Sequence, residues 1–391
     1  MFTWENDFKS HRPDGRVTGS LGALYARLRD TSPRLSYDLE ALKGSERFAE
    51  WQREVKATLR ELLRMPSEDE PQPAPVMLSS EPRDGYHLEK WEFYPDRYSA
   101  VPILLLRPDG LTRPAPGVLC IPGSASPKEL LAGEPMPSNP NCCNYRFDDR
   151  NAQTLHCVKR GYIAVAFDNP GTAEVAELGE STTQTNWSVR VKLVEGYIEA
   201  GLTYVGVSVF QKMQFLKWFK MQPDVDASRL AVMGHSLGTE AALSLALLCD
   251  EFKALVFNDF LCDERRRYCA MTEFENAAGN GNWHHVPGIW QYFAFPDMLA
   301  ALAPKYLALN EGGAEEWLDK VRASYANAGA SDRLSISSYP KFADTPPMRG
   351  MVPLFGLDER RFYEDWCHVD APDHSFRPEP SMKLLEKAFG A

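Results

Sequence analysis

The chain has 391 residues, of which 44% are apolar and 25% are charged, so its composition is that of a globular protein and excludes a disordered or fibrous one. Its 54 acidic residues outnumber its 43 basic residues and give a net charge of −11, which argues against a nucleic-acid-binding protein because such proteins need a basic surface. No apolar run approaches the ~20 residues that span a bilayer, and MFTWENDFKSHRPDGR at the N-terminus lacks the apolar core of a secretory signal. We therefore expect a cytoplasmic protein with neither a membrane nor a nucleic acid as its partner.

Residues 1–80 are predicted to form a helical extension followed by a linker. In ERFAEWQREVKATLRELLRM, apolar residues recur along one helical face, at Phe48, Trp51, Val55, Leu59 and Leu62. The proline-rich stretch 66–76 then ends the helix and leads to the next unit. We expect the extension to pack on that unit, which comprises residues 81–391.

From residue 84 onward, short apolar segments alternate with helical patterns. Segments 86–95 and 101–107 are predicted to be paired strands joined by a turn. Further strands are predicted at 117–123, 162–168, 229–235, 253–259, 305–310 and 333–340, and helices at 147–160, 204–220, 237–248, 314–328 and 381–389. Buried strands that alternate with helices indicate an α/β fold with a mainly parallel central sheet flanked by helices.

Two long segments, 124–146 and 260–300, interrupt this alternation. Loops of that length in a compact domain are usually functional lids or caps. We therefore expect cap-like insertions, the second of them at 260–300 within the main unit.

The motif Gly234-His235-Ser236-Leu237-Gly238 carries the chemistry that we predict for this chain. It directly follows the strand at 229–235 and directly precedes a helix of small residues. This context is that of a nucleophile elbow, a strained turn that lifts a serine above the carboxyl edge of a sheet and needs small flanking residues. Ser236 is therefore the predicted nucleophile, and the alternative is an ordinary glycine-rich turn between a strand and a helix.

A serine hydroxyl needs a base to remove its proton, and the partners of such an elbow follow it in the order acid, then histidine. His374 lies in a loop just before the C-terminal helix and is the predicted base, with His368 as the fallback. His284 and His285 fall inside the insertion at 260–300. We do not interpret them as a metal site, because no acidic or thiol partner stands at ligand spacing.

The predicted acid is Glu311, which directly follows the strand at 305–310 and precedes two glycines. Its role would be to hold the tautomer of the histidine and to stabilise the imidazolium that forms during the reaction. Asp259, after the preceding strand, is the rival for this role, and Asp263 is third. The alternative for each is a loop carboxylate that caps backbone N–H groups.

Acyl transfer also needs donors to the oxyanion. The backbone N–H of Leu237 is predicted to be one of them, and the other is expected from the loop after the strand at 117–123, at Ser124 or equally at Ala125. Substrate contacts are expected from Trp283 and Trp290 in the insertion and from Lys128 near the oxyanion loop. The alternative for the tryptophans is that they pack the insertion onto the body.

Four stretches, CIPGSASPKELLAGEP, DASRLAVMGHSLGTEAAL, FNDFLCD and LNEGGAEEWL, together with His374 in DHSF, resemble the α/β-hydrolase superfamily. Within it, the chain is similar to the dienelactone-hydrolase and acetylxylan-esterase-like branch, and the helical extension fits the acetylxylan-esterase-like members better. The resemblance runs from residue 85 to residue 390. It implies an α/β-hydrolase fold and hydrolysis of carboxylic esters, often acetyl esters on sugars, without a metal or another cofactor.

We therefore expect a serine carboxylic-ester hydrolase that acts through an acyl-enzyme on short-chain, acetyl-type esters, including those of carbohydrates. Its expected partner is the small-molecule ester. A peptidase, an amidase or a C–C bond hydrolase with the same triad is the alternative among enzymes. A non-catalytic binding protein on a hydrolase scaffold is the alternative outside them, and labelling of Ser236 by a phosphonate would distinguish the two classes.

Overall fold

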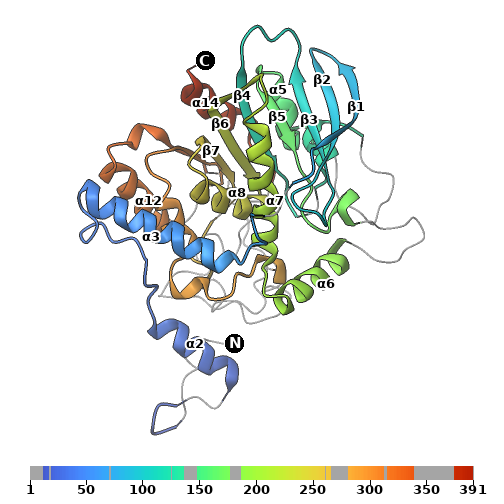
Figure 1. Cartoon of the computed structure of the whole chain (residues 1–391). Coiled ribbons are helices and arrows are strands. Elements are labelled where there is room, and N and C mark those ends of the chain that lie inside the picture. Colours follow the sequence, from blue (N-terminus) through green and yellow to red (C-terminus); the bar gives the residue numbers. More distant parts are fainter. Residues whose placement is uncertain are drawn as a thin grey trace.

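The structure is a computed structural model that describes residues 12–16, 19–69, 72–124, 126–135, 148–176, 186–259, 261–265, 281–311, 315–338 and 374–390. Within these ranges, nine strands form one sheet in the order β1-β2-β3-β5-β4-β6-β7-β8-β9 (Figure 1). The antiparallel part comprises β1 (Val76–Arg83), β2 (Tyr86–Phe93) and β3 (Val101–Pro108), and β3 also runs antiparallel to β5. The parallel part comprises β5 (Ile163–Ala166), β4 (Ala115–Ile121), β6 (Val225–His235), β7 (Phe252–Asn258), β8 (Tyr306–Leu309) and β9 (Leu334–Ile336). The predicted mainly parallel sheet of an α/β fold is confirmed.

The central strands are buried on both faces of the sheet. In β4, Leu119 and Ile121 belong to the hydrophobic core on one face, whereas Val118 and Cys120 belong to the core on the other. A strand covered on both sides needs an apolar residue at every position, because successive side chains point to opposite faces. This explains the continuous apolar runs that mark the central strands in the sequence.

Helices cover both faces of the sheet, as Figure 1 shows. One face carries α3 (Ser45–Leu63), α7 (Tyr204–Phe219), α8 (Leu237–Leu248), α11 (Phe295–Ala300) and α12 (Glu315–Asn327). The other face carries α4 (Lys128–Ala132), α5 (Gln153–Val158) and α14 (Pro378–Phe389). In Figure 1, α2 (Ser20–Asp30) lies away from the sheet, below the other helices.

The predicted N-terminal helix, α3, shares its hydrophobic core with the main unit. Val55, Leu59 and Leu63 have no exposed surface and lie in the same core as the apolar side chains of α8. The segment before α3 is also attached to the main unit, because the Tyr37 N–H donates a 2.8 Å hydrogen bond to Asp297 Oδ1 on α11. Residues 35–63 are therefore part of the packed core as well as of the extension.

Two elements of eight residues or more were not predicted. The edge strand β1 begins at Val76, inside the expected linker, and all but its last residue are exposed, so no alternation of buried apolar residues marks it. Its Pro82 is tolerated because an edge strand has an outer side without ladder hydrogen bonds. The second is α6 (Asn186–Glu199), where Arg190 and Val194 are the buried side chains among those described, so no apolar stripe indicates a helix.

The two segments expected to be lids or caps are partly built into the core. Within the first, α4 places Leu130 and Leu131 in the core, and residues 136–147 lie outside the described residues. Within the second, α11 belongs to the core, and residues 260 and 266–280 lie outside the described residues. Short helices in these segments escaped prediction because five or six residues hold too few turns to show a helical period.

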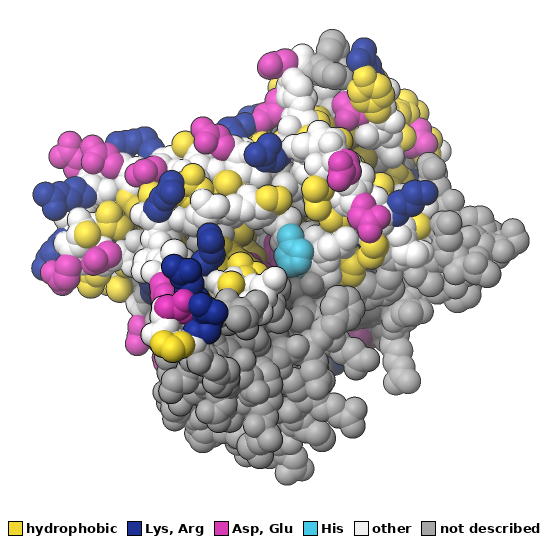
Figure 2. Space-filling model, turned by 90° about the horizontal axis from the view of Figure 1, so that it is seen from below, with side chains coloured by type: hydrophobic (Ala, Val, Ile, Leu, Met, Phe, Trp, Pro, Cys, Tyr) yellow, Lys and Arg dark blue, Asp and Glu magenta, His cyan; other side chains and the backbone are white. Residues whose placement is uncertain are grey.

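The described surface carries both signs of charge. On the face drawn in Figure 2, the Lys and Arg side chains are interspersed with Asp and Glu rather than gathered in one area. Among the helices that the structure describes, none combines the length and the apolar character that crossing a bilayer requires.

Candidate active site

Ser236 occupies a strained turn between β6 and α8. Its φ is +51° and its ψ is −129°, a conformation that crowds the Cβ of an L-residue and recurs at functional sites. The flanking glycines make this turn possible. A Cβ on Gly238 would lie 2.3 Å from the carbonyl oxygen of Ile121, and a Cβ on Gly234 would lie 2.6 Å from that of Gly238. The local geometry is therefore that of a nucleophile elbow.

The loop after β4 passes directly beside Ser236. A Cβ built on Gly123 would lie 3.3 Å from the Cβ of Ser236. Asn169 Nδ2 holds this loop by donating hydrogen bonds to the carbonyl oxygens of Pro122 (2.8 Å) and Gly123 (3.0 Å). Because a trans peptide directs its N–H opposite to its carbonyl, the bond to Gly123 also fixes the direction of the Ser124 N–H.

Arg190 on α6 is a second anchor of this loop, and no sequence pattern predicts it. Its guanidinium is fully buried and donates hydrogen bonds from Nη2 to the carbonyl oxygen of Ser124 and to Thr172 Oγ1. The guanidinium also lies 4.8 Å from the ring centre of Trp283, a cation–π contact. No motif surrounds Arg190 in the sequence, so only the folded arrangement shows that it holds the loop.

The structure brings Glu311 and His374 together beside the elbow. Glu311 directly follows β8 and is 3% exposed, and its Oε1 lies 2.6 Å from Nδ1 of His374 in the loop before α14. The ring of His374 lies against the ring of His235, with 4.7 Å between the ring centres. Since His235 precedes Ser236 in the chain, Glu311 and His374 lie near the turn that carries Ser236.

His235 is an uncharged neighbour of His374. Its ring is buried, and burial lowers the pKa of His235 well below its usual value, with the proximity of His374 as a second cause. A charge on either ring disfavours a charge on the other. Of the two rings, only that of His374 is in contact with a carboxylate among the contacts described.

The other predicted acids and histidines lie in different surroundings. Asp259 follows β7 and lines a small cavity together with Leu309 and Trp317. His284 Nδ1 lies 2.6 Å from Glu240 Oε1 on α8, so an acid accompanies this histidine although none was apparent from the spacing. His368 and Ala125 lie outside the described residues.

The structure gives Lys128 a role different from the predicted contact with substrate. Its side chain has no exposed surface, and its Nζ lies 3.0 Å from Asp168 Oδ2, 2.9 Å from Glu129 Oε1 and 2.7 Å from Glu174 Oε2. Burial alone would lower the pKa of Lys128, but these carboxylates raise it above its usual value. The ammonium therefore anchors α4 to the end of β5, and we assign it no contact with substrate.

The two predicted tryptophans differ in exposure. Trp283, in the turn Asn282–His284, is 4% exposed and packs with Leu237, Val194 and Tyr204. Its ring therefore supports the residue that follows Ser236, as the packing alternative describes. Trp290, in the turn Ile289–Gln291, is half-buried.

A strained serine between a parallel strand and a helix, next to a histidine that an acid holds, defines an α/β-hydrolase. The model of the Abhydrolase family matches residues 4–387, and the chain therefore belongs to this family. The predicted resemblance to the α/β-hydrolase superfamily is thereby confirmed.

A solved structure supports the narrower branch. The structure of a "putative acetyl xylan esterase" from Bacteroides fragilis NCTC 9343 is 38% identical to this chain, covers 99% of it and 100% of its own chain, and superposes with a TM-score of 0.86. The predicted acetylxylan-esterase-like branch is confirmed by this match.

Two more distant proteins share the fold or part of the sequence. A glucuronoyl esterase from Solibacter usitatus is 14% identical, covers 79% of this chain and 93% of its own, and has a TM-score of 0.52, which shows a common fold. The "Putative hydrolase YtaP" of Bacillus subtilis (strain 168) is 23% identical over 181 residues, 44% of this chain and 56% of that protein. The chain thus spans little more than half the length of this curated relative.

Proposed function

We propose that the protein is a serine carboxylic-ester hydrolase that acts through an acyl-enzyme on acetyl esters of carbohydrates. The observation that carries the proposal is the 2.6 Å contact between Glu311 Oε1 and His374 Nδ1 beside the strained turn at Ser236. A carboxylate on Nδ1 fixes the tautomer in which Nε2 accepts a proton. This is the form of histidine that a serine nucleophile requires.

In the proposed mechanism, Ser236 Oγ attacks the ester carbonyl while His374 Nε2 takes the hydroxyl proton. The imidazolium then gives this proton to the departing alcohol, which leaves an acetyl group on the serine. Water attacks the acyl-enzyme after losing a proton to His374, and the proton returns to Ser236 as acetate departs. Glu311 stabilises the imidazolium in both halves of the reaction.

The negative charge of each tetrahedral intermediate needs donors that are in place before the reaction. We assign them to the backbone N–H groups of Leu237 and Ser124. Leu237 opens the twelve-residue helix α8, whose N-terminal end favours negative charge. Asn169 and Arg190 hold the two carbonyl groups on either side of Ser124, which supports a fixed direction for its N–H.

The proposed specificity for acetyl esters of carbohydrates rests on similarity to a solved relative and to a branch of the superfamily. The relative with 38% identity over 99% of the chain is described as a "putative acetyl xylan esterase", and the sequence resembles the same branch. An acetyl ester of xylan presents a small acyl group on a sugar hydroxyl. Acetylated xylo-oligosaccharides are therefore the substrates to test first.

The test compares the wild-type protein with Ser236→Ala and a control variant, Ser324→Ala, which removes a buried hydroxyl from α12 that donates to the carbonyl of Ala300. Turnover of p-nitrophenyl acetate and release of acetate from acetylated xylo-oligosaccharides are measured for all three. We expect Ser236→Ala to abolish both reactions with an unchanged unfolding temperature, and Ser324→Ala to retain them. A phosphonate should label the wild-type protein and Ser324→Ala, but it should not label Ser236→Ala.

Three results would contradict the proposal. Full activity of Ser236→Ala would exclude this serine as the nucleophile. Faster turnover of an aryl amide than of the matching aryl ester would indicate an amidase. Failure of the phosphonate to label the folded wild-type protein, together with no ester turnover, would indicate a binding protein on a hydrolase scaffold.

A further inference from the structure

We infer that Asn258 is a positioning residue that sets His374 relative to Ser236. It hydrogen-bonds both to the backbone of Ser236 and to the backbone of the loop that carries His374. The inference rests on the proposed function, since it concerns the geometry of the proposed base and nucleophile. Asn258 is the last residue of β7 and has no exposed surface.

The backbone of Asn258 holds the nucleophile. Asn258 is the register partner of His235 across the parallel pair β6 and β7. Its carbonyl oxygen accepts a 3.1 Å hydrogen bond from the N–H of Ser236. The ladder between the two strands therefore continues into the strained turn, and the backbone of Ser236 is fixed to the end of β7.

The side chain of Asn258 holds the loop that carries the proposed base. Its Oδ1 accepts a 2.8 Å hydrogen bond from the Arg377 N–H, and its Nδ2 donates a 3.3 Å hydrogen bond to the carbonyl oxygen of Ser375. One of these bonds needs an acceptor on the side chain and the other needs a donor, so only one orientation of the amide makes both. An exchange of its oxygen and nitrogen would set donor against donor and acceptor against acceptor.

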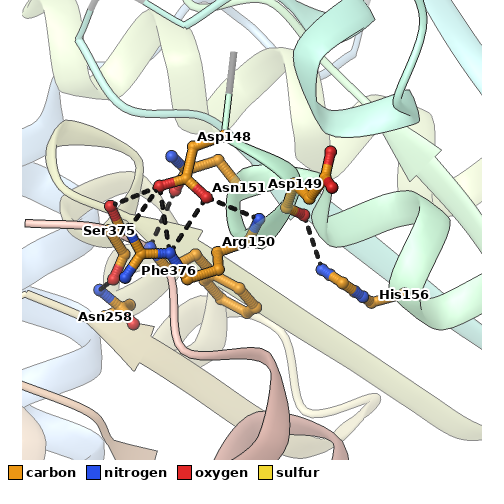
Figure 3. A network of polar contacts seen from close by, with 8 residues as sticks. All are labelled: Asp148, Asp149, Arg150, Asn151, His156, Asn258, Ser375 and Phe376. Carbon is orange, nitrogen blue, oxygen red and sulfur yellow. Dashed lines mark hydrogen bonds and ion pairs between the residues drawn. The ribbon is translucent and has the colours of Figure 1, made fainter. Parts of the chain in front are cut away.

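The same loop is also held by residues of the segment before α5, which Figure 3 shows in one network with Asn258. Ser375 Oγ donates a 3.1 Å hydrogen bond to Asp148 Oδ2, and the Phe376 N–H donates a 2.8 Å hydrogen bond to Asn151 Oδ1. The hydrogen bond from Arg150 is the main cause that lowers the pKa of Asp148, so this acceptor stays charged at neutral pH. These residues fix the loop to the segment after β4, whereas Asn258 fixes it to the nucleophile.

The consequence is that a few hydrogen bonds through Asn258 connect the proposed base to the proposed nucleophile. His374 is one residue away from Ser375, and Ser236 bonds directly to Asn258. Loss of the amide would remove the two hydrogen bonds that join Ser375 and Arg377 to the end of β7. The loop would then be held only from the side of Asp148 and Asn151 among the contacts described here, and the imidazole would shift relative to the serine. A misplacement of about 1 Å at a reacting group costs on the order of 100-fold in rate.

The experiment uses the full chain with Asn258→Ala and the isosteric Asn258→Asp, beside Ser324→Ala as the control for loss of a buried hydrogen bond far from the site. Asn258→Asp keeps the acceptor for the Arg377 N–H but turns an oxygen toward the carbonyl of Ser375, so it tests the donor with little change in shape. For each variant, kcat and KM for p-nitrophenyl acetate are determined per site titrated with a phosphonate, which excludes unfolded protein from the count. The downfield proton resonance of the bond between His374 and Glu311 is recorded as a readout independent of turnover.

We expect both Asn258 variants to lose about 100-fold in kcat per titrated site with KM nearly unchanged, and to shift or lose the downfield resonance. Ser324→Ala should keep the wild-type kcat and the wild-type resonance. The inference is overturned if the Asn258 variants match Ser324→Ala in kcat and resonance, or if they lose only stability. A wild-type protein without ester turnover would refute the proposed function instead, and the resonance would still decide whether Asn258 positions His374.

Discussion

Replacing Glu311 by glutamine removes one negative charge from a buried hydrogen bond while keeping its shape. The Oε1 atom lies 2.6 Å from His374 Nδ1, and the Glu311 side chain is 1% exposed. The centres of charge of a carboxylate and an imidazolium in such contact are about 4 Å apart, and at an effective dielectric constant of about 20 their attraction is about 4 kcal/mol. Because the imidazolium forms only during the reaction, loss of this attraction should lower kcat by about 1,000-fold.

The assay is hydrolysis of p-nitrophenyl acetate, with kcat expressed per phosphonate-titrated site and KM determined in parallel. KM should change little, since Glu311 stabilises a charge that is absent from the ground state. The matched control is Asp259→Asn, the same chemical change at a carboxylate that lines the cavity beside Leu309. We expect this control to keep activity within a few-fold of the wild-type protein.

The reasoning would be refuted if Glu311→Gln stayed within tenfold of the wild-type kcat. It would also be refuted if Asp259→Asn caused the larger loss, because the role of the acid would then belong to Asp259. A fall in unfolding temperature without a fall in kcat per titrated site would assign Glu311 a purely structural role.

Two further predictions concern the turn around Ser236. Burial, and next the proximity of His374, hold the folded-state pKa of His235 well below 6.5, so below that pH the unfolded chain binds more protons than the native one. As the pH is lowered below 6.5, this group should therefore reduce the free energy of unfolding by up to about 1.4 kcal/mol per pH unit. Urea unfolding at several pH values should show this slope for the wild-type protein and lack it for His235→Phe; equal slopes would contradict the assignment. Gly238→Ala places a Cβ 2.3 Å from the Ile121 carbonyl oxygen, which should cost about 1–3 kcal/mol by thermal unfolding. The control Gly196→Ala on α6 meets nothing within 4 Å and should stabilise by up to about 1 kcal/mol; equal effects of the two would refute the steric argument.

The sequence was sufficient wherever a local pattern dictates the structure. The apolar run before Ser236 predicts a strand buried on both faces, and the glycines at 234 and 238 predict a turn that excludes a Cβ, as the contact distances explain. The positions of Glu311 and Asp259 just after two neighbouring strands were enough to name both as candidate acids, with Glu311 preferred. Such inferences are possible because parallel strands end at one edge of the sheet.

The sequence was insufficient wherever a residue acts through a distant partner. Lys128 was expected to contact substrate, but its buried ammonium is held by Asp168, forty residues away in the chain. Arg190 and Asn258 show no pattern of their own, because their partners come from other elements of the fold. The edge strand β1 was missed since an exposed strand carries no burial periodicity.

The packing of α3 against the core has a consequence for how the chain acquires its structure. Leu59 and Leu63 belong to the same core as Leu243 on α8, although the helices are separated by most of the sheet in sequence. During synthesis, the apolar face of α3 leaves the ribosome long before its partners exist, and such delayed long-range pairing slows folding and leaves nascent chains prone to aggregation. Residues 45–63 should therefore govern the yield of folded protein, through chaperone demand, more than they govern the rate of the finished enzyme.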